Sequence, residues 1–522
     1  MMMKKNIYLA ALMVASALPV AAQETYEIAE VATENLNGTA RYVSMGGAME
    51  ALGADISTIS TNPAGIGLFR KSQFVGTLGL VSQDGEDGWS SANKTNVSFD
   101  QIGFVYSTRT SADSYLNFGF NYHKSRNFNQ LLSVADRLDG ASQSKLTYEK
   151  FRWGLIEGAN DASYTQADML YHEGLYDTQL LNDDGSFNTD AYSFMGNNYI
   201  YRRGNYGYIG EYDVNLSGNI KNRVYLGLTI GIHDVNYRGH SLYMEQVQPN
   251  PYQLYDASLE DSRNIDGTGV DVKAGVIFRP IEESPFRLGL YINTPIFYSL
   301  KSNNVTTLLL NGERYGDHNP HASSFEYEFR TPWKFGFSAG HTVSNYLALG
   351  ATVEYTDYSA TDARIKGDSG YDWYYDQYWS TSDSDNAMNA HVKETLKGVA
   401  TVKVGAEVKP DKDLAIRAGY NYVAPMYKEE GVRGFLQDGS PVWADGTYFS
   451  STTDYTNWKA THRLTLGLGV GLGANWKLDA AYQYSMQKGQ FLPFTGSDDN
   501  QPFATSVKNN RHQWMLSAAY TF

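Results

Sequence analysis

A short string in the second half of the chain matches a pattern that activates serine as a nucleophile. Gly336-Phe337-Ser338-Ala339-Gly340 has the form G-x-S-x-G, which works only where a strand-to-helix turn exposes the serine hydroxyl. Here the string ends one alternating segment and leads through a short turn into another. We therefore expect no catalysis at Ser338 and no enzyme activity.

Other groups that could hold an ion or a cofactor have simpler interpretations. The glycines at 467, 469, 471 and 473 lack the following helix that a phosphate site needs. Residues 182–190 resemble part of a calcium loop without its final glutamate. The histidines include no H-E-x-x-H string and no pair four residues apart, and the chain has no cysteine. We expect no metal site and no cofactor.

An aromatic run extends from Tyr371 to Trp379 in a segment that we predict to be an extracellular loop. Such a run could bind a sugar or a hydrophobic ligand. It could equally serve loop packing or lie at a membrane surface. The sequence alone leaves these alternatives open.

The composition indicates that strands position these residues. The 522 residues include 40 Tyr, 23 Phe and 9 Trp, a mixture that favours strands. Lys and Arg number 42 against 57 Asp and Glu, a net charge of −15 that argues against a nucleic-acid partner. No apolar run of about 18–20 residues occurs beyond the N-terminus, which argues against a helical membrane protein.

The N-terminus has the features of an export signal. Lys4 and Lys5 precede an apolar stretch that ends at Leu18, and Val20-Ala21-Ala22 places small residues where a signal peptidase cleaves. We predict a signal peptide over residues 1–22 with cleavage before Gln23, so the mature chain leaves the cytoplasm.

From about Gln73 onward, apolar residues alternate with small or polar ones, which is the period of a strand. Two clear examples are Val224–Ile232 and Leu464–Val470. Each such segment has one apolar face and one wet face. A soluble sheet with one solvated face and a membrane barrel both fit this pattern.

Two features favour the barrel. Long and short connections alternate along the chain, as they do when extracellular loops are long and periplasmic turns short. Aromatic residues also gather near the ends of the apolar rows, where a barrel meets the membrane–water boundaries; they include Tyr106, Tyr355, Tyr420, Tyr422, Trp476, Tyr482 and Tyr484. We therefore expect outer-membrane lipids to cover the apolar face.

The end of the chain points the same way. An alternating segment runs from Trp514 to the terminal Phe522, and this ending resembles the C-terminal signature of bacterial outer-membrane barrels. It implies that the barrel-assembly machinery is a partner that recognises Phe522.

The sequence thus predicts an all-β, closed, 14-stranded antiparallel transmembrane barrel over residues 73–522. Each strand has the roughly 9–11 residues that a tilted span needs, and closure leaves no unpaired edge in the bilayer. The predicted strands are 73–82, 96–108, 113–124, 206–219, 223–236, 262–279, 286–298, 323–340, 346–359, 395–409, 413–425, 457–472, 475–487 and 508–522.

Two predicted strands are irregular, and one connection is unusually long. The apolar row switches register near Asp100-Gln101, which predicts a bulge. Pro332 falls on the inward row and removes a ladder donor, which predicts a bend or bulge, and we interpret both distortions as corrections to the barrel shape. The longest connection, 125–205, is predicted to be extracellular, with helical spacing in 144–158 and 163–182.

Residues 23–72 lack alternation but carry a distinctive string. Small residues between Ala40 and Ala48 are followed by Asp55 and then by Asn62-Pro63-Ala64-Gly65. Here the sequence resembles the FadL family of outer-membrane transporters for hydrophobic compounds, which includes long-chain fatty-acid and aromatic-hydrocarbon channels. The resemblance covers residues 24–522. It implies a 14-stranded barrel with an N-terminal luminal plug, or hatch, over residues 23–72 of this chain.

The resemblance also implies site residues. Residues 62–64 would contact the barrel where strand distortions open a lateral gap, and the first mature residues would lie near the ligand pocket. Without the resemblance, Asn62-Pro63-Ala64-Gly65 is simply a turn. The long loop at 125–205 departs from the family, whose helical capture loops come later in the chain. The implied ligand-binding residues are Gln23, Glu24, Tyr26, Asn62, Pro63 and Ala64.

The resulting hypothesis is a monomeric, TonB-independent channel for passive uptake of a hydrophobic small molecule, fatty-acid-like or aromatic, across the bacterial outer membrane. The ligand would be captured in the lumen and released sideways into the bilayer. An alternative is a surface binding or adhesion barrel that acts through its long extracellular loops.

Overall fold

The computed structural model describes residues 24–522 except 155, 157–165, 177–179, 251–252, 316–320, 373, 375–376, 436–452 and 498–499. The predicted signal peptide and Gln23 lie outside the described residues.

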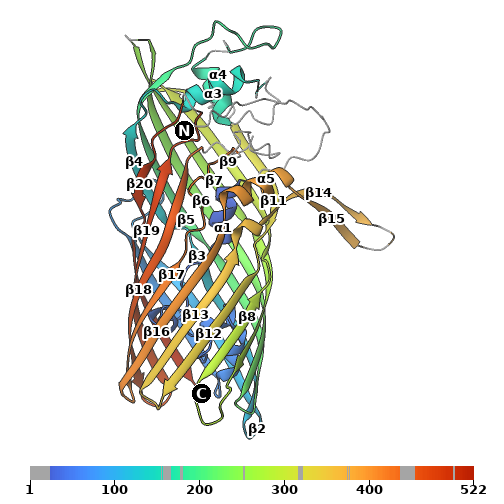
Figure 1. The fold of residues 1–522 in the computed structure, drawn as a ribbon, viewed down its shortest axis with the longest axis vertical. Coiled ribbons are helices and arrows are strands. Elements are labelled where there is room, and N and C mark those ends of the chain that lie inside the picture. The colour runs from blue at the N-terminus through green and yellow to red at the C-terminus, as the bar shows by residue number, and fades with distance from the viewer. Residues whose placement is uncertain are drawn as a thin grey trace, which may run out of the picture.

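One antiparallel sheet closes on itself to form a barrel of 14 strands, as the sequence predicts (Figure 1). The first strand pairs with the second on one side and with the last on the other, so the described wall has no open edge. In order around the barrel, the wall consists of β1 (Gln73–Gln83), β2 (Thr95–Ser111), β3 (Ser114–Asn127) continued by β4 (Gln130–Arg137), β5 (Met195–Ile220), β6 (Val224–Asn250), β7 (Gln253–Phe278), β8 (Arg287–Asn293) continued by β9 (Phe297–Leu310), β11 (His321–Arg330) continued by β12 (Lys334–Val343), β13 (Leu347–Asp357), β16 (Gly398–Asp411), β17 (Leu414–Val423), β18 (Tyr455–Leu472), β19 (Trp476–Leu492), and β20 (Thr505–Lys508) continued by β21 (Arg511–Thr521).

The two faces of each strand differ as predicted. On β18, Leu466 is 58% exposed on the outside whereas the adjacent Thr465 is 2% exposed on the inside. Leu228 and Thr229 of β6 show the same contrast. The inner row is not simply wet, however, because the Thr465 hydroxyl donates a hydrogen bond to the backbone oxygen of Ser44, 3.0 Å away in the N-terminal segment.

Both predicted distortions are confirmed. In the β1–β2 pair, Thr77 faces Gln101 and Leu78 faces Phe99, so Asp100 is the extra residue of a bulge. Near Pro332 the strand is interrupted between β11 and β12, and the neighbouring strand is interrupted at the same level between β8 and β9. Thr331 bridges the two breaks: its amide donates to Ile296 O (3.1 Å) and its hydroxyl accepts from Ile296 N (2.8 Å).

The strands are longer than predicted toward the end of the barrel opposite the turns. We expected a loop over 237–261, but β6 and β7 continue as a paired hairpin through most of it. Beyond Ile232 the outward row of β6 becomes polar, with Asp234, Asn236 and Arg238, while the inward row stays buried. The pairing of β6 with β7 therefore continues where the outward residues of β6 are no longer apolar.

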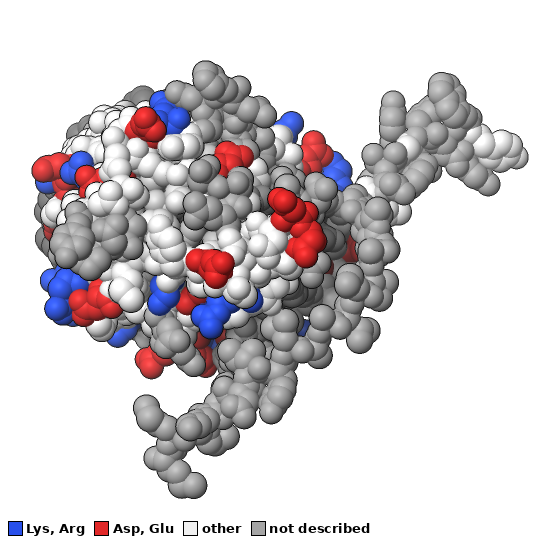
Figure 2. Space-filling model, turned by 90° about the horizontal axis from the view of Figure 1, so that it is seen from above, with Lys and Arg blue, Asp and Glu red and all other residues white. Residues whose placement is uncertain are grey.

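The long connection expected over 125–205 is largely wall as well. The strand formed by β3 and β4 reaches Arg137, and β5 begins at Met195. Between them lie α3 (Gln143–Arg152) and α4 (Gln166–Gly174), which confirm the helical spacing with shorter bounds than predicted. Seen from above, side chains of both charges surround this end of the molecule (Figure 2).

The connection between β13 and β16 leaves the wall. After η3 (Tyr358–Ala360), β14 (Asp362–Asp372) and β15 (Gln377–Ser384) form a hairpin that projects sideways (Figure 1), and α5 (Asn386–Thr395) returns to the barrel. The predicted aromatic run lies at the end of this hairpin, partly outside the described residues. A further short strand, β10 (Glu313–Tyr315), pairs with the end of β9. Among the described residues no helix is long and apolar enough to span a membrane.

The N-terminal segment, residues 24–68, lies inside the barrel (Figure 1, blue). It consists of α1 (Thr25–Ala32), α2 (Ala40–Ser44), η1 (Ile56–Ser60) and η2 (Pro63–Leu68), joined by turns. Its contacts reach strands on opposite sides of the wall, for example Ser217 of β5 through Pro63 O and Thr465 of β18 through Ser44 O. We call it the luminal segment.

Candidate functional site

The Asn62-Pro63-Ala64 turn begins η2 and is held from both sides. The Asn62 carboxamide accepts from Ala64 N (3.2 Å) and donates to Glu50 O (3.0 Å), so it caps the short helix and ties it to the rest of the luminal segment. Pro63 O accepts from Ser217 Oγ of β5 at 2.8 Å. Asn62 is fully buried, so the turn is internal.

Glycines in the wall make room for this turn. A Cβ added to Gly275 of β7 would lie 2.0 Å from Asn62 Oδ1, and one on Gly227 of β6 would lie 2.3 Å from the Pro63 carbonyl carbon. Any larger residue at these two positions would displace the turn. Of the glycines at 467, 469, 471 and 473, Gly467 also makes room for the luminal segment, because a Cβ there would meet Ser44 at 2.3 Å.

Buried ion pairs join the luminal segment to the wall. Lys403 of β16 donates to Glu50 at 2.9 Å and also contacts Glu354 of β13. Arg41 of α2 meets Glu407 of β16 at 3.1 Å. Each of these charges therefore has a partner of opposite sign, as burial requires.

Glu24 and Tyr26 are among the first described residues and lie at the start of α1. Glu24 caps the helix by accepting from Tyr26 N (2.9 Å), and its carboxylate lies 3.5 Å from Arg433, in the segment that follows β17. The Tyr26 ring stacks on Tyr427 with 5.1 Å between centroids. Burial raises the pKa of Glu24 from 4.5 to about 7, an effect that the charge of Arg433 partly opposes.

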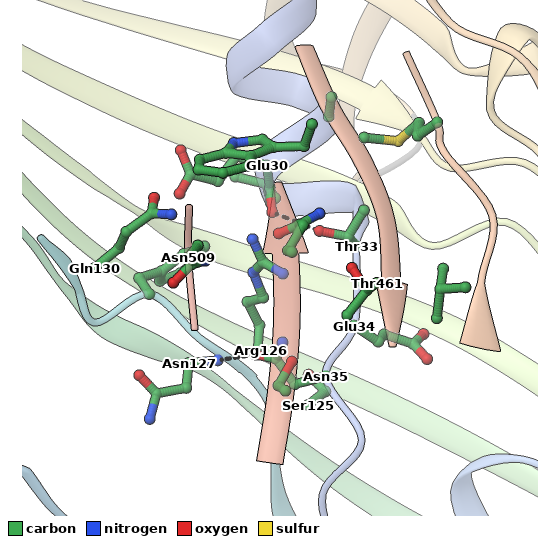
Figure 3. A pocket seen from close by; sticks show the side chains of 18 of the residues that line it. Glu30, Thr33, Glu34, Asn35, Ser125, Arg126, Asn127, Gln130, Thr461 and Asn509 are labelled. Carbon is green, nitrogen blue, oxygen red and sulfur yellow. Dashed lines mark hydrogen bonds between the residues drawn. The ribbon is translucent and has the colours of Figure 1, made fainter. Parts of the chain in front are cut away.

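Above the luminal segment lies a cavity of about 330 Å³. Its lining includes the apolar side chains of Tyr26, Val31 and Leu36 of the luminal segment and of Val399, Met426 and Tyr427 of the wall and its loops. Polar and charged side chains line it as well, and Figure 3 shows Arg126 pointing toward Glu30, with Asn35, Thr461 and Asn509 around it. A lining that is partly apolar and partly charged suits an amphipathic molecule.

A second hollow lies on the outer surface, where β7, β8, β12 and β13 form an apolar groove. Leu290, Ile292, Phe335 and Phe337 line it from the outside. Gly275 lines it too, and Gly275 is the residue that Asn62 contacts from the lumen. At this point a single glycine separates the luminal segment from the outer surface of the barrel.

A cluster of buried charges within the wall escaped the sequence analysis. Lys273 Nζ contacts Glu211 (2.7 Å), Asp271 (2.9 Å) and Asp213 (3.3 Å), and His123 and His233 lie next to these carboxylates. The histidines and carboxylates have spacings that could hold a metal ion, but the ammonium of Lys273 already lies among the three carboxylates. All six occupy inward positions of β3, β5, β6 and β7, a signal visible only once these strands are paired.

The structure places the other predicted residues as follows. Tyr26 lines the cavity and Glu24 caps the same helix, whereas Asn62, Pro63 and Ala64 lie against β6 and β7, so the two groups are separate. Gln23 lies outside the described residues. Ser338 is in the middle of β12, 1% exposed, and its hydroxyl donates to Gly289 O (3.4 Å), which is not the geometry of a nucleophile.

No protein-family model and no curated protein sequence matches the chain. A FadL homologue from Pseudomonas aeruginosa matches its structure with a TM-score of 0.51 and 14% identity, over 94% of this chain and 99% of that chain. The chain has the FadL-type fold. Other solved FadL-type structures align less closely: the CymD monoaromatic hydrocarbon channel (TM-score 0.49, 10% identity, 94% and 99% covered) and the Ralstonia pickettii toluene transporter TbuX (TM-score 0.46, 11% identity, 94% and 99% covered).

Proposed function

We propose that this protein is a bacterial outer-membrane channel for passive uptake of hydrophobic or amphipathic small molecules. The observation that carries the proposal is the division of the lumen: a polypeptide segment packs tightly against the wall in the lower part, and a partly apolar cavity remains above it. A general diffusion pore would need a continuous water path, which this packing opposes.

Capture would use the apolar side chains of the cavity. Burial of ligand surface against Tyr26, Val31, Met426 and Tyr427 supplies about 25 cal/mol per Å² of apolar area, so uptake down a concentration gradient needs no further energy source. In this proposal Glu24 and Tyr26 form the part of the pocket that can move, because they lie at the start of the luminal segment, and Gln23 is assigned to the same part because it precedes them in the sequence.

Release would be lateral, through the wall between the lumen and the outer groove. Two features support this route. The groove is apolar and meets the luminal turn at Gly275. The paired interruptions at 294–296 and 331–333 remove ladder hydrogen bonds at the upper end of β8 and β12, next to the groove. Movement of Asn62, Pro63 and Ala64 away from Gly275 would then loosen the wall there.

A reversible lock of the luminal segment tests this proposal. The chain has no native cysteine, so Pro63→Cys with Ser217→Cys places the only two thiols in the protein where a side chain of β5 contacts the turn that has to move. We expect oxidised double variant in proteoliposomes to lose uptake of a small hydrophobic probe and to regain it after reduction. Each single variant is the control.

Two outcomes would contradict the proposal. One is uptake that continues at the wild-type rate in the locked protein. The other is a wild-type protein that passes hydrophilic solutes of the same size equally well, as a general pore would. Deletion of residues 138–194 addresses the adhesion alternative: loss of cell attachment with unchanged uptake would assign binding to the extracellular end.

A further inference from the structure

The lining of the cavity has the opposite charge balance to the chain. The whole sequence is acidic, with 42 Lys and Arg against 57 Asp and Glu. Among the described residues that line the cavity, ten are Lys or Arg and eight are Asp or Glu. A cavity that concentrates positive charge in an acidic protein favours anions.

Half of these ten cations are paired with carboxylates. Arg203 meets Asp454 (2.9 Å), Lys334 meets Glu34 (2.6 Å), and Arg263, Lys403 and Arg433 have carboxylate partners as well. Of the other five, Lys124 donates to the Ser98 hydroxyl (3.0 Å), Lys459 is exposed, and the remaining three are Arg126, Arg463 and Arg511. Within the part of the chain that the structure describes, none of these three guanidinium groups forms an ion pair with a carboxylate.

The three arginines converge from different strands. Arg463 of β18 pairs with Ser485 of β19, and Ser485 pairs with Arg511 of β21. Arg463 and Arg511 therefore lie in one row across three strands, with Ser485 between them. Adjacent strands lie about 4.8 Å apart, which puts the two arginines about 10 Å apart at the backbone. Arg511 donates to the carbonyl oxygens of Asn127 (3.5 Å) and Asn129, next to Arg126. The positive charge of Arg126 repels the positive charges of Arg463 and Arg511.

The arginines have hydrogen-bonding capacity to spare. The Nε atoms of Arg126 and Arg511 are buried without a partner in the described structure. A buried donor without an acceptor costs about 1–3 kcal/mol, more for a charged group. Ser485 and Thr461 hydroxyls and the Asn509 carboxamide line the cavity beside them and can add neutral hydrogen bonds.

The number of charges indicates the class of ligand. The negative charge of Glu30 attracts Arg126 and Arg511, and it offsets one of the three positive charges. Two positive charges remain without a counter-charge. A single carboxylate would leave one of them unpaired, whereas a doubly charged head group would balance both.

We propose that Arg126, Arg463 and Arg511 form a binding site for a dianionic head group, a phosphate monoester or a dicarboxylate, carried by the molecule that the channel takes up. This inference rests on the proposed function only in its last clause, because binding of the head group does not require transport. The apolar side chains of the cavity then hold the remainder of the molecule.

Calorimetric titration of the purified protein with four small aromatic probes tests the site. Phenyl phosphate and phthalate are dianions, benzoate is a monoanion and benzyl alcohol is neutral. We expect the dianions to bind at least about tenfold more tightly than benzoate, and benzyl alcohol to bind most weakly, because each charge-assisted hydrogen bond contributes about 1.5–3 kcal/mol. Inorganic phosphate shows whether the head group suffices.

Arginine variants locate the site. Arg126→Gln should weaken both dianions at least about tenfold and leave benzyl alcohol unchanged, and Arg126→Lys should lie between Arg126→Gln and wild type. Arg137→Gln is the matched control, since Arg137 is 74% exposed at the end of β4. A difference in gel mobility between unheated and boiled samples shows that the barrel of each variant is folded.

The outcomes separate the two proposals. Equal affinity for dianions, benzoate and benzyl alcohol, or an undiminished dianion preference in Arg126→Gln, would overturn the dianion site. If the affinities show no preference for dianions but proteoliposomes take up phthalate faster than protein-free liposomes do, the channel function stands and the site is wrong. If they take up none of the probes although the dianions bind tightly, the site stands and the channel function is wrong.

Discussion

Two groups of charges among the described residues of the lumen differ: those that join the luminal segment to the wall have partners of opposite sign, and three arginines of the cavity do not. The first group includes Glu50 and Lys403, and glycines let backbone meet backbone between the same segment and the wall. The second consists of Arg126, Arg463 and Arg511, which lie in a cavity among the described residues without a carboxylate partner. Matched charges hold a structure together, whereas unmatched ones are available to a ligand.

Removal of a matched charge that joins the luminal segment to the wall should have the largest effect. Lys403→Met leaves Glu50 and Glu354 buried without their shared cation, and we expect a loss of about 3–5 kcal/mol in the free energy of unfolding. Lys409→Met removes a half-exposed cation on the same strand and should cost less than about 1 kcal/mol. Denaturant titration of both variants measures the difference; equal losses would show that these ion pairs do not hold the segment.

A side chain added where backbones meet should have the next largest effect. Gly275→Val forces atoms into Asn62, and we expect a loss of about 1–3 kcal/mol together with leakage of small hydrophilic solutes through the barrel. Gly218→Val is the control, because nothing lies within 4 Å of a Cβ at Gly218. Conductance in planar bilayers reports the leak. A tight Gly275→Val channel would mean that the luminal turn does not depend on this contact.

Acidity should change how firmly α1 is held in the barrel. Burial raises the pKa of Glu24 to about 7, so its protonated form favours docking of α1. This contribution is complete below the unperturbed pKa near 4.5 and is lost as the pH rises through about 7. We expect hydrogen exchange of the α1 amides, corrected for intrinsic rates, to be at least about tenfold faster at pH 8 than at pH 5. Glu24→Gln should remove this dependence, and its persistence in that variant would assign the effect to another group.

The smallest effect is expected for the arginines of the cavity. Arg126→Gln removes one of three like charges that have no carboxylate partner among the described residues, so the free energy of unfolding should change by less than about 0.5 kcal/mol or rise slightly. This is the opposite of the result expected for Lys403→Met. A loss of several kcal/mol would mean that Arg126 is structural, like the charges that join the luminal segment to the wall.

The barrel could be predicted from the sequence because its strands alternate wherever lipid would cover them. The bulge at Asp100 and the interruption at Pro332 were visible for the same reason, since each breaks the apolar row or the hydrogen-bond ladder. The extensions of β5, β6 and β7 were missed because outward residues such as Asn236 and Arg238 are polar there. Strand pairing continued without the apolar signal on which the prediction relied.

The candidate site was less predictable. Tyr26 and Glu24 were expected near the pocket only through the family resemblance, and they line or adjoin the cavity. Arg463 and Arg511 were unremarked because 48 residues separate them in the sequence, and only the pairing of both strands with β19 brings them into one row. The same is true of the cluster around Lys273. Long-range pairing decides such clusters, and a single sequence does not contain it.

Labelling of single introduced cysteines tests the division of the lumen most directly, because the native chain has none. Ser485→Cys places a thiol in the upper cavity, and Ser517→Cys places one behind α2, where the Ser517 hydroxyl accepts a hydrogen bond from Ala40 N at 2.7 Å. A membrane-impermeant maleimide added outside intact cells should label Ser485→Cys readily and leave Ser517→Cys unlabelled until the protein is denatured. Equal labelling of both thiols would show that the luminal segment does not close the lower lumen.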